Sequence, residues 1–160
     1  MSTIKFLLYL KCNILLIIIV KMMKEHILLI SSIYLCYMDI RCRRVPNPTI
    51  FITATLLLLS DIFFDPKLLF PSFSCSLFFF LIFNLIFFFK KGIGYGDVKY
   101  ITLLAYVLPF YYVILSILIA SLIALLFIII FRSQQKELPF IPFLSIGLIS
   151  SVYVMNLYHI

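Results

Sequence analysis

Two aspartates, Asp39 and Asp97, stand at the ends of two different apolar segments of a chain that has only six acidic residues. An acidic side chain beside a membrane span is energetically costly, which makes it a candidate for function. Two carboxyl groups that approach each other cannot both ionise readily, so they share a proton. One can then act as general base for a water molecule, while the other polarises a peptide carbonyl as an acid. The sequence therefore raises the hypothesis of acid–base hydrolysis by this pair.

Asp39 opens a short polar cluster that ends in Pro46 and Asn47. The prolines at this point force the chain out of helical geometry, so Asp39 lies at the end of a helix. The basic residues in between are sufficiently explained as anchors on the cytoplasmic side of a membrane. A plain salt bridge to one of them is the structural alternative to a catalytic role for Asp39. These residues are Arg41, Arg43 and Arg44.

Asp97 follows three closely spaced glycines, Gly92, Gly94 and Gly96, and precedes Lys99. Glycine permits close approach of the backbone to another group, so the run predicts a loop that brings Asp97 near a partner chain. The spacing matches neither the P-loop nor the dinucleotide-binding pattern. A flexible turn between two helices, with Asp97 paired to Lys99, is the structural alternative.

The composition indicates a membrane protein. Of the 160 residues 65% are hydrophobic and 12% are charged, and the mean hydropathy is +1.23. A soluble domain of this length cannot bury so much apolar surface. The net charge of +7 does not favour nucleic-acid binding, because the basic residues cluster in short loops where they set membrane orientation.

Apolar runs predict an all-α, polytopic fold with a six-helix transmembrane core in residues 22–160. One extra hydrophobic segment precedes it, and residues 1–21 are interpreted as an added helix, a signal-like stretch or the result of a mis-called start. The core begins near Met22, and its first apolar run ends at Asp39. The seven expected apolar segments are residues 6–20, 27–38, 48–64, 68–89, 98–112, 111–131 and 139–158.

Charge in the loops predicts the orientation. Basic loops at 41–44, 90–91 and 132–136 alternate with loops that are acidic or uncharged. The positive-inside rule places the basic loops in the cytoplasm. Two segments separate Asp39 from Asp97, so both lie at the cytoplasmic face. Asp61 and Asp65, which fall in the predicted turn between two segments, lie on the opposite side.

The remaining candidates for chemistry are weaker. The four cysteines form no Cys-x-x-Cys pair, which argues against a zinc or thioredoxin-like site. The two histidines are far apart in the sequence and stand near segment ends, where an interfacial role suffices. These residues are Cys12, Cys36, Cys42, Cys75, His26 and His159.

Three motifs together resemble those of the type IV prepilin peptidases and the wider GxGD membrane aspartyl proteases. The first begins at Asp39 and ends in Val-Pro-Asn, and the second is a Gly-x-Gly-Asp-x-Lys run containing Asp97. A third, over 138–144, is similar to Pro-Phe-Gly-Pro-Phe-Leu of bacterial members, with Ile141 in place of the usual glycine. The resemblance covers residues 22–160. The residues that carry it are Asp39, Arg43, Pro46, Asn47, Gly94, Gly96, Asp97, Lys99, Pro139, Phe140 and Pro142.

The resemblance implies a multi-pass aspartic endopeptidase of the cytoplasmic membrane, with Asp39 and Asp97 catalytic and the other motif residues supporting the site or binding substrate. Members of the family remove the short basic leader of prepilins and pseudopilins after a glycine, at the cytoplasmic face, for type IV pilus assembly and protein secretion. It implies no metal and no cofactor. Many bacterial members also methylate the new N-terminus with an added N-terminal region. Residues 1–21 cannot stand in for that region, so peptidase activity without methylation is expected.

Two other hypotheses remain. One is an inactive relative of the peptidases that acts as an assembly partner. The other is a transport component that uses Asp39 and Asp97 as cation or proton sites. Intact motifs disfavour both. The bilayer and a prepilin-like substrate are the expected partners, and the sequence does not give the oligomeric state.

Overall fold

The computed structural model describes residues 2–89, 94–131 and 138–158, and the side chains of 22–89, 94–130 and 138–157. Every regular element in these residues is a helix, which confirms the all-α prediction. The basic loops at 90–91 and 132–136, Gly92 and His159 lie outside the described residues. The helices are α1 (Ser2–Cys42), α2 (Asn47–Phe64), α3 (Pro66–Phe89), α4 (Tyr95–Val107), α5 (Phe110–Phe131) and α6 (Ile141–Tyr158).

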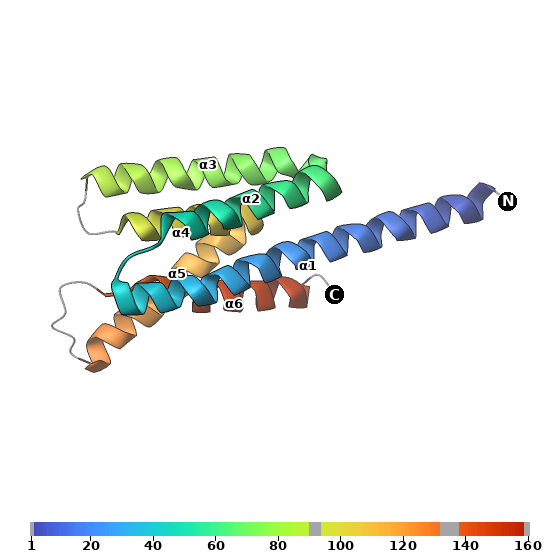
Figure 1. Ribbon diagram of the computed structural model, residues 1–160. Helices are drawn as coiled ribbons and strands as arrows, with labels where there is room; N and C mark the ends of the chain where they lie inside the picture. Colours follow the sequence, from blue (N-terminus) through green and yellow to red (C-terminus); the bar gives the residue numbers. More distant parts are fainter. Residues whose placement is uncertain (1, 90–93, 132–137, 159–160) are drawn as a thin grey trace.

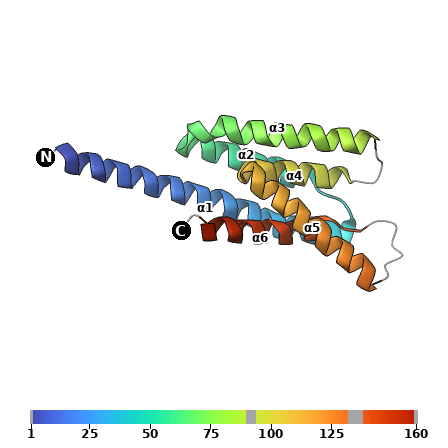
Figure 2. The ribbon, with the colours of Figure 1, turned by 180° about the vertical axis from the view of Figure 1, so that it is seen from behind.

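The helices form a bundle from which the N-terminal part of α1 projects (Figure 1). Helix α1 packs against α2 and α6, α3 packs against α4, and α5 packs against α6; Figure 2 shows the same neighbours from behind. The C-terminal ends of α1, α3 and α5 meet the N-terminal ends of α2, α4 and α6 at one end of the bundle, on the left in Figure 1. The three sequence motifs stand at these helix ends.

Helix α1 corrects one expectation. The apolar segments at 6–20 and 27–38 were expected to be separate, but they belong to one continuous helix of 41 residues. The polar residues between them include neither proline nor glycine. Lysine, methionine and glutamate are good helix formers, so nothing in this stretch ends a helix. Met22 is therefore not the start of an element.

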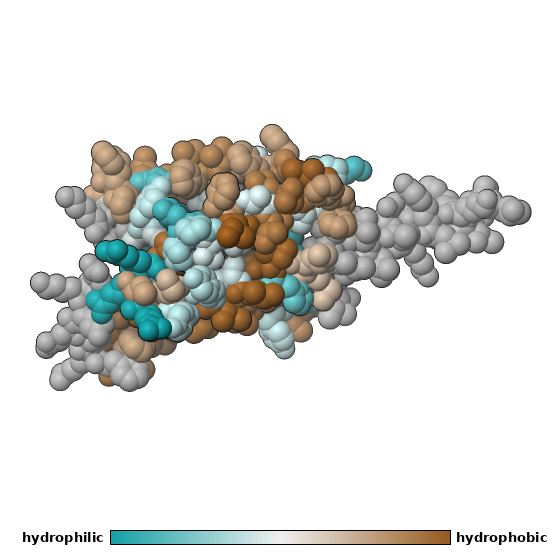
Figure 3. Space-filling model, viewed as in Figure 1, coloured by the Kyte–Doolittle hydropathy of each residue, from teal (hydrophilic) through white to brown (hydrophobic). Residues whose placement is uncertain are grey.

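Three helices among the described residues are long and apolar enough to cross a membrane: Asn47–Phe64, Pro66–Phe89 and Phe110–Ile130. A shorter apolar helix covers Ile141–Leu157. The outer surface is also that of a membrane protein, because large apolar side chains are exposed on it: Phe70 is 78% exposed and Phe88 is 82% exposed. Figure 3 shows hydrophobic residues spread over α2 and α3. A surface of this kind is unsuited to water but suits lipid, so the chain is a multi-pass membrane protein.

Helix α4 is the central element. It has 13 residues, more than half of them buried, and it contacts all five other helices. The segment predicted for 98–112 ends early, at Val107, because Pro109 cannot donate the N–H that a continuing helix requires. The backbone N–H of Leu108 donates to the Leu104 carbonyl at 2.9 Å and closes α4, and α5 begins at Phe110. This short, enclosed helix carries Asp97 in its first turn.

Candidate active site

Asp39 lies in the last turn of α1, with 8% of its surface exposed. Its Oδ2 accepts a hydrogen bond of 3.1 Å from the backbone N–H of Ile141, the first residue of α6. The first N–H groups of a helix have no partner within the helix, so a carboxylate is well suited to receive one of them. The contact fixes the Asp39 carboxyl against the start of α6.

The third motif shapes this helix start. Pro139 and Pro142 contribute no N–H group, and the Phe140 carbonyl accepts hydrogen bonds of 3.1 Å from the N–H groups of Phe143 and Leu144. The N–H of Ile141 is thus available to Asp39. Because a main-chain group makes the contact, isoleucine can replace the glycine of bacterial members without losing it.

Asp97 sits half-buried in the first turn of α4. Its N–H donates to the Gly94 carbonyl at 3.0 Å, and Gly94 precedes the helix in an extended conformation. A side-chain carbon on Gly94 would stand 3.1 Å from Oδ2 of Asp97. Glycine at this position leaves room beside the carboxyl group.

Gly96 brings the first two motifs into contact. A side-chain carbon at this position would overlap with Cγ2 of Val45 and would stand 3.1 Å from its Cβ. The backbone of α4 therefore lies directly against the connection between α1 and α2. This close approach favours glycine at position 96, because a side chain there requires the Val45 side chain to shift or to be shortened.

Lys99 also joins the two motifs. Its Nζ donates to Oδ1 of Asn47 at 2.6 Å and lies 4.5 Å from the centre of the Tyr95 ring. Among the described side chains no ion pair joins Lys99 to Asp97. The structural alternative of a plain salt bridge between these two residues is therefore wrong.

The chain turns sharply at the end of α1. Arg43 has a φ of 50°, in the left-handed region that residues other than glycine rarely adopt. Its N–H donates to the Asp39 carbonyl at 3.0 Å, and the extended Pro46 then leads into α2 at Asn47. Strained backbone of this kind is concentrated at functional sites.

The charge of Asp39 acts on the Asp97 carboxyl. Both residues lie at helix ends, beyond the apolar runs. Burial raises the pKa of Asp97 most, the charge of Asp39 raises it further, and a backbone hydrogen bond with Gly94 partly offsets both effects. Burial also raises the pKa of Asp39, against the opposing hydrogen bond from Ile141. Burial thus raises the pKa of both carboxyl groups, and the charge of Asp39 adds to the increase at Asp97.

The type IV leader peptidase family matches residues 26–129, which is more than half of the chain. The chain belongs to this family. The match includes both Asp39 and Asp97 and ends before the third motif at 138–142. No curated protein and no solved structure matches the chain.

The structure brings the predicted residues of this leader peptidase site to one end of the bundle. Their roles in catalysis and substrate binding remain predictions. Among the described residues no group of three His, Cys, Asp or Glu side chains gathers in the manner of a metal site. The residues at this end are Asp39, Arg43, Pro46, Asn47, Gly94, Gly96, Asp97, Lys99, Pro139, Phe140 and Pro142.

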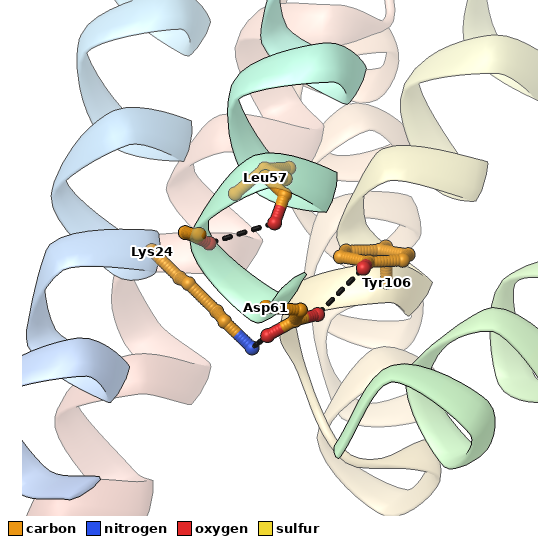
Figure 4. Close-up of polar contacts among 5 residues, drawn as sticks. Lys24, Leu57, Asp61 and Tyr106 are labelled. Carbon is orange, nitrogen blue, oxygen red and sulfur yellow. Dashed lines mark hydrogen bonds and ion pairs between the residues drawn. The ribbon is translucent and has the colours of Figure 1, made fainter. Parts of the chain in front are cut away.

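A second cluster of polar side chains, which was not predicted from the sequence, lies among α1, α2 and α4. Asp61, predicted in a turn, lies in α2 with none of its surface exposed. Its carboxyl forms an ion pair with Lys24 of α1 and accepts a hydrogen bond of 2.5 Å from the Tyr106 hydroxyl of α4 (Figure 4). The sequence held only a weak indication that Asp61 belongs to the helix and Asp65 to the turn. Three apolar residues follow Asp61, whereas Pro66 follows Asp65.

Proposed function

We propose that this chain is an aspartic endopeptidase that removes the basic leader of prepilin-like proteins after a glycine, at the cytoplasmic membrane face. The observation that carries the proposal is that Asp39 and Asp97 stand at the same end of the bundle (Figure 1), where three motifs meet and the N–H of Ile141 holds the Asp39 carboxyl. Membership of the leader peptidase family supports the reaction class. Peptidase activity without methylation is part of the proposal.

In the proposed reaction the two aspartates have distinct roles. The ionised Asp39 takes a proton from water as the oxygen attacks the peptide carbonyl carbon, while Asp97 donates its proton to the carbonyl oxygen. The tetrahedral intermediate collapses when the protonated Asp39 transfers its proton to the amide nitrogen and the C–N bond breaks. Asp97 recovers its proton from the hydroxyl group that becomes the new carboxyl carbonyl. The pair ends in its starting protonation state.

All six helices take part in the proposed transmembrane core, with the ends that carry the motifs in the cytoplasm. The exposed arginines Arg41, Arg43 and Arg44 stand at this end, where Figure 3 shows hydrophilic residues beside the α1–α2 connection. Basic residues favour the cytoplasmic side. This orientation puts the site where a prepilin leader remains after its apolar helix has entered the bilayer.

Substrate recognition then rests on the apolar helix of the prepilin. A basic leader is not attracted to a mouth that carries Arg41, Arg43, Arg44 and Lys99. The apolar helix can instead lie against the helices of the core, with the charges setting its depth. Replacing Arg41 and Arg44 with glutamine, with the motif residue Arg43 kept, is expected to change cleavage little; a large loss would contradict this mode of recognition.

The test is Asp39→Asn and Asp97→Asn, each co-expressed with a prepilin and assayed for leader removal on gels. Each change is expected to reduce cleavage by about 10²–10⁴-fold, because it removes one of the proton-transferring groups. Asp65→Asn is the matched control and should cleave normally. Full processing by either variant would exclude the dyad, and a wild-type chain that cleaves no prepilin would favour the inactive relative.

A further inference from the structure

The cluster of Lys24, Asp61 and Tyr106 is as deeply buried as the apolar core. Asp61 is fully enclosed and 6% of the Lys24 side chain is exposed, while 7% of Tyr106 is exposed. In Figure 4 the three side chains come from three different helices and converge on the Asp61 carboxyl. A buried charge is retained only where its partner is well placed, so the contact fixes α1, α2 and α4 relative to one another.

The cluster shares two helices with the proposed catalytic pair. Helix α1 carries Lys24 about four turns before Asp39, and α4 carries Tyr106 about two and a half turns after Asp97. Between them, the hydroxyl groups of Ser32 and Tyr100 are 2.6 Å apart, in a buried hydrogen bond from α1 to α4. The two helices therefore meet through a direct hydrogen bond at Ser32 and Tyr100 and, further from the proposed catalytic pair, through Asp61 of α2.

Such contacts matter because lipid tails are as apolar as the side chains of a helix. Apolar packing alone gives little preference for one rotation or register of two helices in a bilayer, whereas polar contacts between helices do. Helix α4 offers mostly apolar side chains to its neighbours, among them Ile101, Leu103 and Leu104. Tyr106 and Tyr100 supply the directional contacts that set its rotation against α1.

We propose that the Lys24–Asp61–Tyr106 cluster is a positioning device that holds α4 against α1 and α2 so that Asp97 faces Asp39. Asp61 is its central positioning residue, since it alone contacts both other members. The inference rests on the proposed peptidase function, because it concerns the alignment of that catalytic pair.

The first experiment separates alignment from stability. A triple variant, Lys24→Met with Asp61→Leu and Tyr106→Phe, replaces the cluster with apolar groups of similar volume. Such replacements of buried ion pairs are often neutral for stability or stabilising. The variant should fold with a wild-type Tm in detergent, yet its kcat should fall by about tenfold to a hundredfold with little change in KM. Tyr34→Phe and Asp65→Asn, both outside the cluster, are controls that should keep wild-type kinetics.

The second experiment needs no activity. A side-chain carbon at Gly96 would stand 3.1 Å from Cβ of Val45; disulfides have Cβ–Cβ distances of about 3.5–4.5 Å, so a shift of a few tenths of an ångström allows the bond to form. Val45→Cys with Gly96→Cys, in a chain whose four native cysteines are replaced by serine, reports whether the start of α4 meets the connection between α1 and α2. Mild oxidation followed by peptide mapping gives the rate of bond formation. We expect this rate to fall at least several-fold when the triple variant is added.

The outcomes are separable. Wild-type kcat and wild-type cross-linking in the triple variant would overturn the positioning role. If the triple variant does not fold, the single variant Tyr106→Phe tests the proposal, since it removes only one hydroxyl group. It should lower kcat and the cross-linking rate several-fold. Unchanged values of both would overturn the proposal. If the wild-type chain cleaves no prepilin, the proposed function fails, and the cross-linking rates still judge the cluster.

Discussion

Helices α1, α2 and α4 bring carboxyl groups into two clusters with opposite surroundings. In one, Asp61 is paired with the ammonium group of Lys24 and a tyrosine hydroxyl. In the other, burial and the charge of Asp39 raise the pKa of the Asp97 carboxyl. A carboxylate beside a cation is stabilised in its charged form, whereas two carboxyl groups together compete for ionisation. The partner therefore decides whether a buried aspartate holds the fold or can exchange a proton.

The largest difference between the clusters should appear in stability. Asp61→Asn leaves the Lys24 charge buried without its counter-ion, and breaking a buried pair in this way costs about 3–5 kcal/mol. Chemical unfolding in detergent micelles should show this loss in the free energy of unfolding. Asp65→Asn, in the next turn of the chain, is the control and should change stability by less than about 0.5 kcal/mol. Equal effects of the two variants would mean that the pair does not hold the bundle.

The next effect concerns close packing beside the proposed catalytic pair. Gly96→Ala places a methyl group against Val45, and overpacking of this kind costs about 1–3 kcal/mol. We expect prepilin cleavage to fall with it. Adding Val45→Ala should restore both stability and cleavage, because it removes the atoms that the new methyl group would meet.

Gly147 is a matched control for Gly96, because a side chain there would come closest to backbone rather than to another side chain. Its added carbon would meet the backbone carbonyl of Ser116, which no trimming of a side chain can move. Gly147→Ala with Ser116→Ala should therefore remain destabilised when assayed in parallel. Rescue at Gly147 but not at Gly96 would contradict the packing shown by the structure.

A smaller effect should depend on pH. Burial and the Asp39 charge raise the pKa of Asp97 in the folded chain above its unfolded value of about 3.9. The folded state therefore retains this proton better, and wild-type stability falls as pH rises from the unfolded pKa through the folded pKa. Asparagine does not titrate, so Asp97→Asn should gain in Tm over wild type across that range and then level off. A gain that is the same at about pH 4 and about pH 8 would count against the raised pKa.

The smallest effect is expected from the exposed link between Lys99 and Asn47. The two side chains are 2.6 Å apart at their polar atoms, and exposed contacts to charged groups are worth little. Lys99→Met, Asn47→Ala and the double variant form a cycle whose coupling energy should be about 0.5–1 kcal/mol in unfolding experiments. A coupling near zero would show that the contact does not tie the first two motifs together.

Much of the fold was predictable. The expected segments at 48–64, 68–89 and 111–131 agree closely with α2, α3 and α5, since proline and charged residues mark the ends of long apolar runs. The continuity of α1 was not predicted. The charged residues near 21–26 suggested a loop, but lysine, methionine and glutamate favour a helix, so the two apolar segments form one continuous helix.

The polar cluster of Asp61 shows why other features were missed. Asp61 and Asp65 look similar in the sequence, and only tertiary contacts distinguish them. In a membrane protein both the core and the outer surface are apolar, so periodicity does not indicate which face of a helix is buried. The motif residues were grouped correctly at one end of the bundle, but the hydrogen bond from Ile141 to Asp39 depends on a backbone group that no motif identifies.

The brevity of α4 has a further consequence. Its 13 residues extend over about 20 Å, well short of the ~30 Å thickness of a hydrocarbon core. A lipid-exposed helix of this length would thin the surrounding bilayer. Helix α4 is instead enclosed by its neighbours, with Val98 and Leu104 both buried. The depth of Asp97 is therefore set by protein rather than by acyl-chain length, so the same carboxyl can keep its place in membranes of different lipid composition.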